Sequence, residues 1–488
     1  MKTLFIMMDS LNRHFLNVYG NSFIKTPNID RLAKRGIVFE NHYSGSLPCM
    51  PARREMMTGR FNFMETPWGP IEPWDDCLPV ELKKQKGIYC HMITDHYHYF
   101  HSGGEVYNTL FDTWEFERGQ EGDFWHPLVK EPKRPVFKGK NRRPYWVNRE
   151  FAELENEEDY STPRCFKRAI EFIENNHQED NWHLHLELFD PHEPFMCPQK
   201  YIDMYNDSWD NRYHFDWPKY APVEEEEEAV EHIINRYAGV LTMADHWLGK
   251  LLDKMDEYNM WKDTVIIFST DHGHLLGEHG YWAKNYTFDY QELVHIPLIM
   301  CTPETAFKNK KITALTQTVD IMPTIMELHK AQVFETVHGK SLLHLLNKDD
   351  EKHHDTVLYG YFGKDINIFD GQYSYCRQPV EDSVVYHHTA MPREYHDFCD
   401  RDLLKTADFG QFLKHTYGIS HFRLKKKSYR HHNAPDYNII YDIKDDPNQR
   451  KPIMDEQLEK KLSQKMIDIM KSYDAPENEF KRIGLDFM

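Results

Sequence analysis

Two short apolar runs that each end at a carboxylate constrain the fold of this chain most strongly. Residues 2–8 lead directly into Asp9, and residues 264–269 lead through a threonine into Asp271 and His272. Continuous apolar runs of this length are typical of strands buried on both faces, as in parallel sheets covered by helices. Ligand sites in open α/β sheets lie at the carboxyl ends of the strands, so the sequence predicts a site there that contains both aspartates.

Helical and strand patterns alternate along the first 350 residues. Helical patterns cover 26–36, 78–87 and 230–255, and strand patterns cover 37–39, 88–94, 182–189 and 296–301. This alternation predicts an α/β fold with a large mixed, mostly parallel sheet flanked by helices. Residues 101–165 are polar and aromatic without steady periodicity, so we expect long loops and short helices there.

The character of the chain changes after a charge cluster at 348–352. Short strand candidates at 356–361, 372–376 and 437–442 precede a helical pattern at 454–473. We therefore predict a catalytic α/β domain over residues 1–350 and a smaller α+β subdomain over residues 351–488.

Composition narrows the classes of partner. The formal net charge of −19 argues against a nucleic-acid groove or an anionic membrane surface. The eight cysteines form no CxxC pair and no zinc-ligand spacing, so we expect mostly reduced thiols. The N-terminal apolar run is too short for a signal peptide, and no stretch approaches the length of a membrane span. The sequence therefore predicts a cytoplasmic protein.

A helical run begins at a cysteine that is followed by a proline two residues on and an arginine four residues on. Pro51 suits the first helical turn, and Gly59 supplies a stop. Cys49 is therefore expected near a helix N-terminus, where unpaired N–H groups favour an anion. A single cysteine is, however, more often a buried small hydrophobic residue than a catalyst.

The run from Cys49 through Pro51 and Arg53 to the Thr-Gly-Arg at 58–60 resembles the signature of type I sulfatases, members of the alkaline phosphatase superfamily. Further similar segments stand at 26–39, 319–328, 339–343 and 441–447, so the resemblance covers nearly the whole chain. It implies an alkaline phosphatase-like fold. It also implies that a formylglycine-generating maturation enzyme oxidises Cys49 to formylglycine, whose hydrated aldehyde is the nucleophile.

Carried over position by position, the resemblance implies that Asp9, Asp271 and His272 bind one divalent metal ion, with modified Cys49 completing the set. Carboxylate oxygens with one imidazole suit Ca²⁺, which we expect first, or Mn²⁺ or Mg²⁺. A strand-end aspartate can equally cap a turn. Many sulfatases have a second aspartate where this chain has Ser10, a candidate substrate-binding position. The Asp-His pair is similar to that of choline sulfatases and phosphonate monoester hydrolases.

The same resemblance implies how the substrate anion is held. Lys284 resembles the lysine that contacts a sulfate oxygen, and Arg53 adds positive charge. His192 and His98 match family histidines: we expect His192 to be the general acid and His98 to assist product release, and these roles could be exchanged. His96 stands where many sulfatases have a lysine, so it is a second candidate for substrate binding.

Together these residues predict a sulfuric ester hydrolase that acts on a sulfated carbohydrate or another small sulfate ester. A phosphonate monoester or phosphodiester hydrolase with the same nucleophile and metal site is the first alternative, because sulfuryl and phosphoryl centres have similar shapes. A non-catalytic, metal-stabilised binding protein is the second. Four tryptophans in irregular stretches could stack on sugar rings or be buried in packing: Trp68, Trp74, Trp114 and Trp125.

Overall fold

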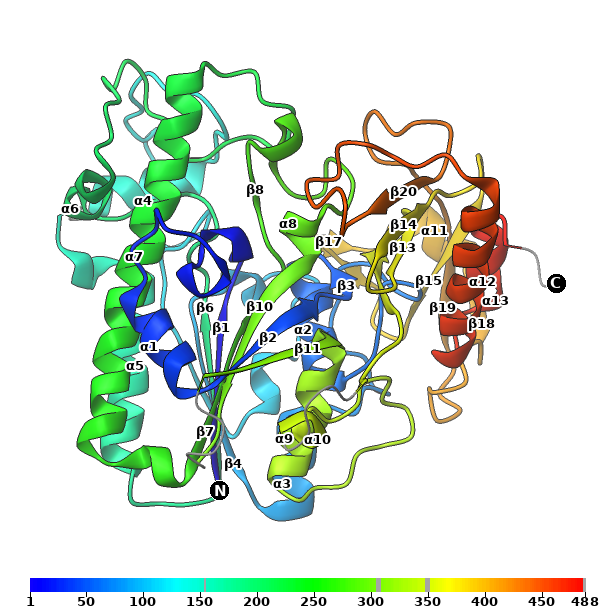
Figure 1. The fold of residues 1–488 in the computed structure, drawn as a ribbon, viewed down its shortest axis with the longest axis horizontal. Helices are drawn as coiled ribbons and strands as arrows, with labels where there is room; N and C mark the ends of the chain where they lie inside the picture. The colour runs from blue at the N-terminus through cyan, green and yellow to red at the C-terminus, as the bar shows by residue number, and fades with distance from the viewer. Residues whose placement is uncertain (153–154, 304–308, 347–351, 486–488) are drawn as a thin grey trace.

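The computed structural model describes residues 1–152, 155–303, 309–346 and 352–485. An eight-stranded sheet crosses its centre in the order β11-β2-β10-β7-β1-β6-β4-β5 (Figure 1). β1 pairs in parallel with β6 and β7, whereas β10 runs antiparallel to both of its neighbours. The predicted mixed, mostly parallel sheet is confirmed. Its strands are β1 (Lys2–Met8), β2 (Ile37–Tyr43), β4 (Tyr89–Thr94), β5 (Thr113–Phe116), β6 (Trp182–Leu188), β7 (Thr264–Thr270), β10 (His295–Cys301) and β11 (Lys310–Gln317).

The central strand β1 is buried on both faces. Leu4, Ile6 and Met8 pack into one core layer, and Phe5 and Met7 pack into the other. Both layers exclude water, which explains why the sequence of β1 is a continuous apolar run and not an alternating one. The first layer lies against α1 (Pro27–Arg35), α5 (Ser161–Asn176) and α7 (Glu227–Glu257), and the second against α2 (Cys49–Thr58), α3 (Leu78–Lys86) and α9 (Ile321–Leu328) (Figure 1).

Neighbouring strands of the sheet end at the same level. Met8 of β1 lies opposite Leu188 of β6 and opposite Thr270 of β7 in the parallel register. The segments that follow these strands therefore leave the sheet side by side, and the end of β4 lies next to them. This shared edge carries the polar residues that the sequence analysis assigned to strand ends.

A second sheet, in the order β20-β14-β13-β12-β3, is built mainly from the C-terminal part of the chain. Its strand β3 (Ser46–Leu47) comes from the segment just ahead of Cys49 and pairs in parallel with β12 (Val357–Tyr361). The helix expected at 454–473 is α12 (Glu456–Ser472), which lies beside α13 (Glu477–Arg482) (Figure 1). The predicted domain boundary at 350/351 lies outside the described residues. The other strands are β13 (Ile366–Phe369), β14 (Tyr373–Arg377) and β20 (Ile439–Asp442).

The expectation of only loops and short helices over residues 101–165 was wrong in one respect. β5 lies within this stretch and forms an edge of the eight-stranded sheet. The strand has four residues, and its Trp114 is 41% exposed. Such a short, half-solvated edge strand carries too little periodicity to be recognised. The opposite edge strand, β11, was not predicted either.

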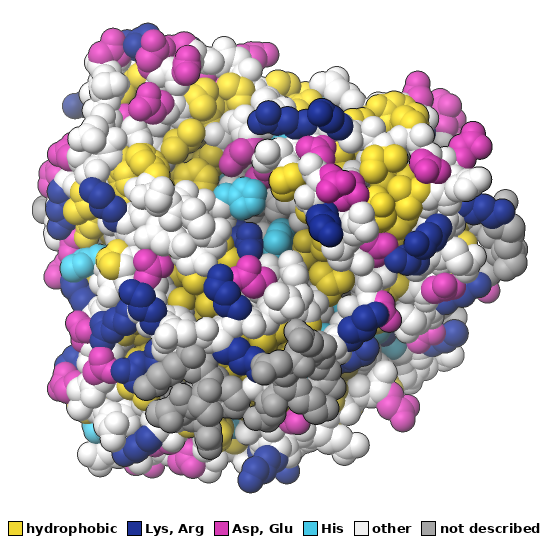
Figure 2. Space-filling model, in the orientation of Figure 1, with side chains coloured by type: hydrophobic (Ala, Val, Ile, Leu, Met, Phe, Trp, Pro, Cys, Tyr) yellow, Lys and Arg dark blue, Asp and Glu magenta, His cyan; other side chains and the backbone are white. Residues whose placement is uncertain are grey.

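The described residues contain no helix that is both long enough and apolar enough to cross a lipid bilayer. All eight cysteines are buried and free of disulfide bonds. Acidic and basic side chains are interspersed over the face drawn in Figure 2. The cytoplasmic location stays a prediction.

A buried carboxyl group ties α2 to the rest of the fold. Glu55 accepts a hydrogen bond from the backbone N–H of Ser46 at 2.5 Å and is hydrogen-bonded to the hydroxyl of Thr318. These contacts connect the helix to β3 and to the segment that follows β11. Burial raises the pKa of Glu55 from its ordinary value of 4.5 to about 7, although its hydrogen bonds oppose the rise.

This raised pKa predicts a pH-dependent stability. A carboxyl group whose pKa is higher in the folded chain than in the unfolded chain must be ionised at a cost inside the protein. The free energy of unfolding therefore falls as the pH rises from the unfolded pKa through the folded pKa, by roughly 3 kcal/mol for Glu55. The substitution Glu55→Gln keeps the shape of the protonated group and removes this cost. The melting temperature of E55Q should therefore exceed that of the wild type by more at pH 8 than at pH 5.

The control is Glu231→Gln on the exposed side of α7. Its melting temperature should differ from that of the wild type by the same amount at both pH values. Equal offsets for E55Q at pH 5 and pH 8 would contradict the prediction.

Candidate active site

The carboxyl edge of the sheet brings together four possible metal ligands. Asp9 follows β1, Asp271 and His272 follow β7, and Cys49 is the first residue of α2. Their ligand atoms all lie within 4.8 Å of one another, and all four residues are buried. The four residues that the sequence analysis grouped as ligands therefore lie at one point, although they come from three segments that are far apart along the chain.

The hydrogen bonds of His272 leave one ring nitrogen as an electron-pair donor. Its Nδ1 lies 2.9 Å from the carbonyl oxygen of Gly273, which can only accept, so Nδ1 carries the proton of the neutral ring. Burial lowers the pKa of His272 well below its ordinary value, which keeps the ring neutral. The unprotonated Nε2 lies 3.2 Å from Asp271 Oδ2 and 3.3 Å from the sulfur of Cys49.

Arg53 holds the carboxylates of this edge in place. Its guanidinium donates to Asp9 at 2.8 Å, to Asp271 at 2.7 Å and to Glu187 of β6 at 2.6 Å. Three carboxylates around one guanidinium leave an excess of negative charge that a cation would balance. The sequence analysis expected Arg53 to help hold the substrate anion. Arg53 does not line the pocket, and its N–H groups donate to Asp9, Asp271 and Glu187 instead.

Glu187 is a site residue that the sequence analysis did not single out. Its side chain is fully buried, and its second oxygen accepts a hydrogen bond from the hydroxyl of Tyr99 at 2.7 Å. A carboxylate within a strand that is otherwise apolar and fully buried is rare unless it is paired, and Glu187 is the last residue but one of β6. That position was the signal that could have identified it.

The thiol of Cys49 is poorly suited to act as a nucleophile itself. Burial and the neighbouring Asp9 raise the pKa of Cys49 well above its ordinary value. Since the thiolate is the reactive form, this shift opposes nucleophilic attack by an unmodified Cys49. The expected preference of this helix N-terminus for an anion is outweighed by burial and by the carboxylates.

Lys284 and Ser10 form a chain of hydrogen bonds that ends at Asp9. The ammonium of Lys284 donates to the Ser10 hydroxyl at 2.8 Å, and that hydroxyl donates to Asp9 at 2.7 Å. Burial by itself would lower the pKa of Lys284, but the carboxylates of Asp9 and Glu193 help to raise it above its ordinary value, so the ammonium stays charged. Ser10 thus contacts a ligand residue, and it is not among the residues that line the pocket.

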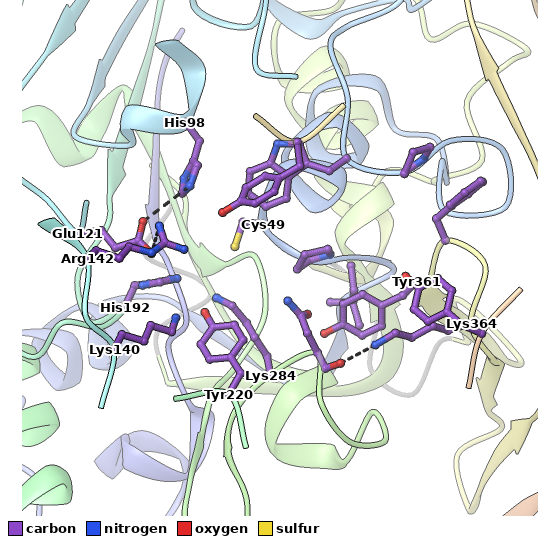
Figure 3. A pocket seen from close by; sticks show the side chains of 18 residues that line it. Cys49, His98, Glu121, Lys140, Arg142, His192, Tyr220, Lys284, Tyr361 and Lys364 are labelled. Atoms are coloured by element: carbon purple, nitrogen blue, oxygen red, sulfur yellow. Dashed lines mark hydrogen bonds and ion pairs between the residues drawn. The ribbon is translucent and has the colours of Figure 1, made fainter. Parts of the chain in front are cut away.

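A pocket of about 440 Å³ opens at Cys49 (Figure 3). Its lining includes four predicted site residues, Cys49, His98, His192 and Lys284. In Figure 3 the sulfur of Cys49 is directed into the cavity, with His98 and His192 on one side and Lys364 on the other. The remaining wall is rich in aromatic and charged side chains: Trp68, Glu121, Lys140, Arg142, Tyr220, Tyr361, Phe362, Lys364, Tyr395 and Tyr429.

Several predicted substrate contacts lie outside this pocket. His96 is fully buried and stacks on Phe189 with ring centroids 5.0 Å apart. Among the four tryptophans considered from the sequence, Trp68 lines the pocket; Trp74 is buried against His421, and Trp114 and Trp125 are about two-fifths exposed elsewhere.

The two pocket histidines differ in their electrostatic surroundings. The Nδ1 of His192 lies 2.6 Å from the carbonyl oxygen of Glu193, to which it donates, and 3.3 Å from the carboxylate of the same residue. Burial and the neighbouring His101 lower the pKa of His98 well below its ordinary value. His98 is therefore a neutral ring with a nitrogen lone pair.

Three further cations reach the pocket from segments where the sequence carried no recognisable signal. Lys140 pairs with Glu193 at 3.1 Å, and Arg142 lies 3.6 Å from Glu121. Lys364 comes from the C-terminal sheet region. Their charges are common on any surface, so only the fold shows that they face the site of Cys49.

The ligand residues fit a hard divalent cation. Burial would raise the pKa of Asp9, but Lys284 and Arg53 together keep it well below its ordinary value, so this carboxylate is ionised. Two carboxylates and one imidazole lone pair are donors that Ca²⁺, Mg²⁺ and Mn²⁺ accept. An oxygen in place of the sulfur at residue 49 would make the donor set harder still.

Comparisons with known proteins define the class. A family model described as Sulfatase matches residues 2–331, so the chain belongs to the sulfatase family, in the alkaline phosphatase superfamily. An arylsulfatase of Clostridium perfringens is 26% identical over 415 residues, which cover 75% of this chain and 82% of that relative.

Two solved structures share the fold. One is titled as a complex with its substrate D-glucosamine-2-N,6-O-disulfate; it has a TM-score of 0.69 at 17% identity and covers 96% of this chain and 97% of its own. The phosphonate monoester hydrolase of Agrobacterium radiobacter has a TM-score of 0.67 at 16% identity, covering 97% and 96%. The alkaline phosphatase-like fold is confirmed, and the protein is a sulfuric ester hydrolase rather than a non-catalytic binding protein.

The three ion pairs of Arg53 predict a specific loss in the variant Arg53→Lys. The three carboxylates are bonded to three different nitrogens of the guanidinium, and the single nitrogen of a lysine cannot span them, so the candidate ligands lose their fixed orientation. We expect the affinity for Ca²⁺ to fall roughly 10–100-fold, measured by calorimetric titration of metal-free protein.

The matched control is Arg54→Lys, which disturbs the bidentate pair of the next residue with Asp75. R54K should keep the wild-type affinity for Ca²⁺. Wild-type affinity in R53K would show that Arg53 does not organise the ligands.

Proposed function

We propose that this enzyme cleaves sulfate monoesters with residue 49 as the nucleophile, after Cys49 is converted to formylglycine, and with one divalent metal ion, Ca²⁺ first among the candidates. The observation that carries this proposal is the convergence of Asp9, Asp271 and His272 on Cys49, which lines the pocket together with Lys284. The high pKa of the unmodified Cys49 thiol supports it, because the cysteine itself is not an effective nucleophile here.

Asp9, Asp271 and His272 would hold the ion together with residue 49. When bound, the ion would polarise the sulfate oxygens and favour an ionised hydroxyl at residue 49. Arg53 keeps the two carboxylates oriented, and its contact with Glu187 fixes the guanidinium itself. The protein thus supplies a ligand set that does not need to reorganise.

Lys284 and the two pocket histidines would share the remaining work. The buried ammonium of Lys284 can stabilise charge on the sulfate oxygens without a change in geometry. His192 would donate a proton to the departing alcohol, supported by the carboxylate of Glu193 beside its ring. His98, a neutral ring, would accept a proton from residue 49 when sulfate is released.

A sulfated carbohydrate is the substrate class that the pocket supports best. Its volume lies in the range of small-molecule sites, and aromatic rings that can stack on sugars line it, among them Trp68, Tyr361 and Tyr429. Lys140 and Lys364 place positive charge on the walls away from the nucleophile. The substrate-bound structural relative holds a sulfated glucosamine, which supports the same class.

The nucleophile can be tested directly. After co-expression with a formylglycine-generating enzyme, mass spectrometry should find an aldehyde at residue 49, and turnover of sulfate esters should rise with the converted fraction. Cys49→Ser should abolish turnover, because a serine ester cannot expel sulfate by forming a carbonyl group. Cys77→Ser, at a buried cysteine outside the pocket, should retain activity.

Full activity with an unmodified Cys49 would overturn the mechanism. The same preparations decide the ester class: sulfated monosaccharides should give a higher kcat/KM than choline sulfate and aryl phosphonates. A higher kcat/KM on phosphonate monoesters or phosphodiesters would support the alternative hydrolase instead.

The histidine roles predict a dependence on the leaving group. His192→Ala should lower kcat roughly 10²–10⁴-fold for sugar sulfates, whose alcohols need a proton, and much less for nitrophenyl sulfate. His98→Ala should slow both substrates alike, because product release is common to them. The control is His126→Ala, outside the pocket, with unchanged rates. Equal losses on both substrates in H192A would contradict its assignment as the acid.

A further inference from the structure

A second cluster of metal-binding side chains lies apart from the pocket of Cys49. Asp320 stands where the segment after β11 enters α9, and His353 and His354 stand just ahead of β12. The Nε2 of His353 lies 3.1 Å from Asp320 Oδ2, and the Nε2 of His354 lies 3.0 Å from each carboxylate oxygen. We propose that these three residues bind a second divalent metal ion, of the Zn²⁺ class.

The hydrogen bonds around His353 argue for a cation. His344 Nδ1 lies 2.8 Å from the carbonyl oxygen of Ser341, so in the neutral ring Nδ1 carries the proton and Nε2 accepts. That Nε2 lies 3.4 Å from His353 Nδ1, which must therefore be the donor. The Nε2 of His353 is left with a lone pair, and this lone pair lies beside an oxygen of Asp320.

Two electron-rich atoms at this separation repel each other unless a cation lies between them. The side chains of His353 and Asp320 are fully buried, so water does not screen the repulsion. The Nε2 of His353 has no hydrogen bond of acceptable geometry within the described part of the chain.

Another imidazole, that of His42, lies near the same carboxylate. The Thr316 hydroxyl donates to the carbonyl oxygen of Asn41 at 3.3 Å, so it accepts from His42 Nδ1 at 2.9 Å. The Nε2 of His42 is then unprotonated, and it is buried without a partner among the described residues. Burial lowers the pKa of His42 to about 3, although the negative charge of the nearby Asp320 acts to raise it. The surroundings of Asp320 thus offer nitrogen lone pairs.

The donor set selects the class of ion. Two imidazole nitrogens and one carboxylate, with a position left for water, match the ligands that Zn²⁺ takes in tetrahedral sites. The backbone N–H groups of Gln317 and Lys340 donate to the Asp320 carboxylate at 2.8 and 2.9 Å. Such outer hydrogen bonds fix the orientation of a ligand carboxylate.

The position of the cluster indicates what the ion does. The backbone N–H of His354 donates to the carbonyl oxygen of Leu315 in β11 at 3.2 Å, so the two sheets already meet here. An ion between Asp320 and the two histidines would cross-link the edge of the eight-stranded sheet to the segment that enters β12. It would thereby secure the sheet region that brings Tyr361 and Lys364 to the pocket.

The test uses the full chain with Asp271 changed to Asn, which removes one of the four candidate ligands of the active site and so weakens zinc binding there. Chelator-treated D271N is loaded with Zn²⁺ alone and desalted. The zinc that stays bound is then measured by elemental mass spectrometry. About one zinc ion per chain should remain, and D271N combined with His353→Gln or His354→Gln should lose it. Zinc should also raise the melting temperature of D271N and not that of the double variants.

Equal zinc content in D271N and in the double variants would overturn the site. X-ray absorption of zinc-loaded D271N gives a readout that leaves the cluster unmutated, in case the glutamine variants fail to fold. Two imidazoles and no sulfur around the zinc are expected, and a thiolate or a single imidazole would equally overturn the proposal. Neither result depends on the sulfatase activity of residue 49.

Discussion

The contact of one guanidinium with three carboxylates is the interaction on which the site depends. β1, β6 and β7 each bring a carboxylate to the same edge of the sheet, and without Arg53 these charges would repel one another in a buried place. Arg53 lies four residues after Cys49, which is one turn along α2, so both project from the same face of the helix. One helix therefore carries both Cys49, the proposed nucleophile, and the arginine that neutralises the carboxylates beside it. The spacing of the cysteine motif follows from this requirement.

The same helix links the two parts of the chain. Ahead of Cys49, β3 pairs with β12 of the C-terminal sheet, and Glu55 binds back to Ser46 of β3. A few hydrogen bonds between β12, β3 and α2 thus fix the positions of C-terminal pocket residues, such as Tyr361 and Lys364, relative to Cys49. The C-terminal part is accordingly part of the binding site, although no catalytic residue was predicted in it.

The sequence predicted those parts of the site that depend on local patterns. Asp9 and Asp271 could be assigned because each directly follows a buried strand, and parallel strands end together. The contact of Glu187 with Arg53 could not be predicted, because it depends on which strand lies beside β1. The helix N-terminus at Cys49 suggested an anion, yet burial and carboxylates raise the pKa of the thiol, an effect that only packing reveals. Lys140 and Arg142 reach the pocket through irregular segments without periodicity.

The two clusters of candidate metal ligands differ in their donor atoms, so they would bind different metal ions. A cysteine thiolate beside His272 would attract zinc in preference to calcium, because soft donors favour transition metals. Burial opposes that thiolate, and conversion of sulfur to oxygen at residue 49 would remove the soft donor altogether. The cluster at Asp320 offers nitrogen in its place and no sulfur. The proposed chemistry at residue 49 would therefore do two things: it would create the nucleophile, and it would make the active site selective for a hard metal ion.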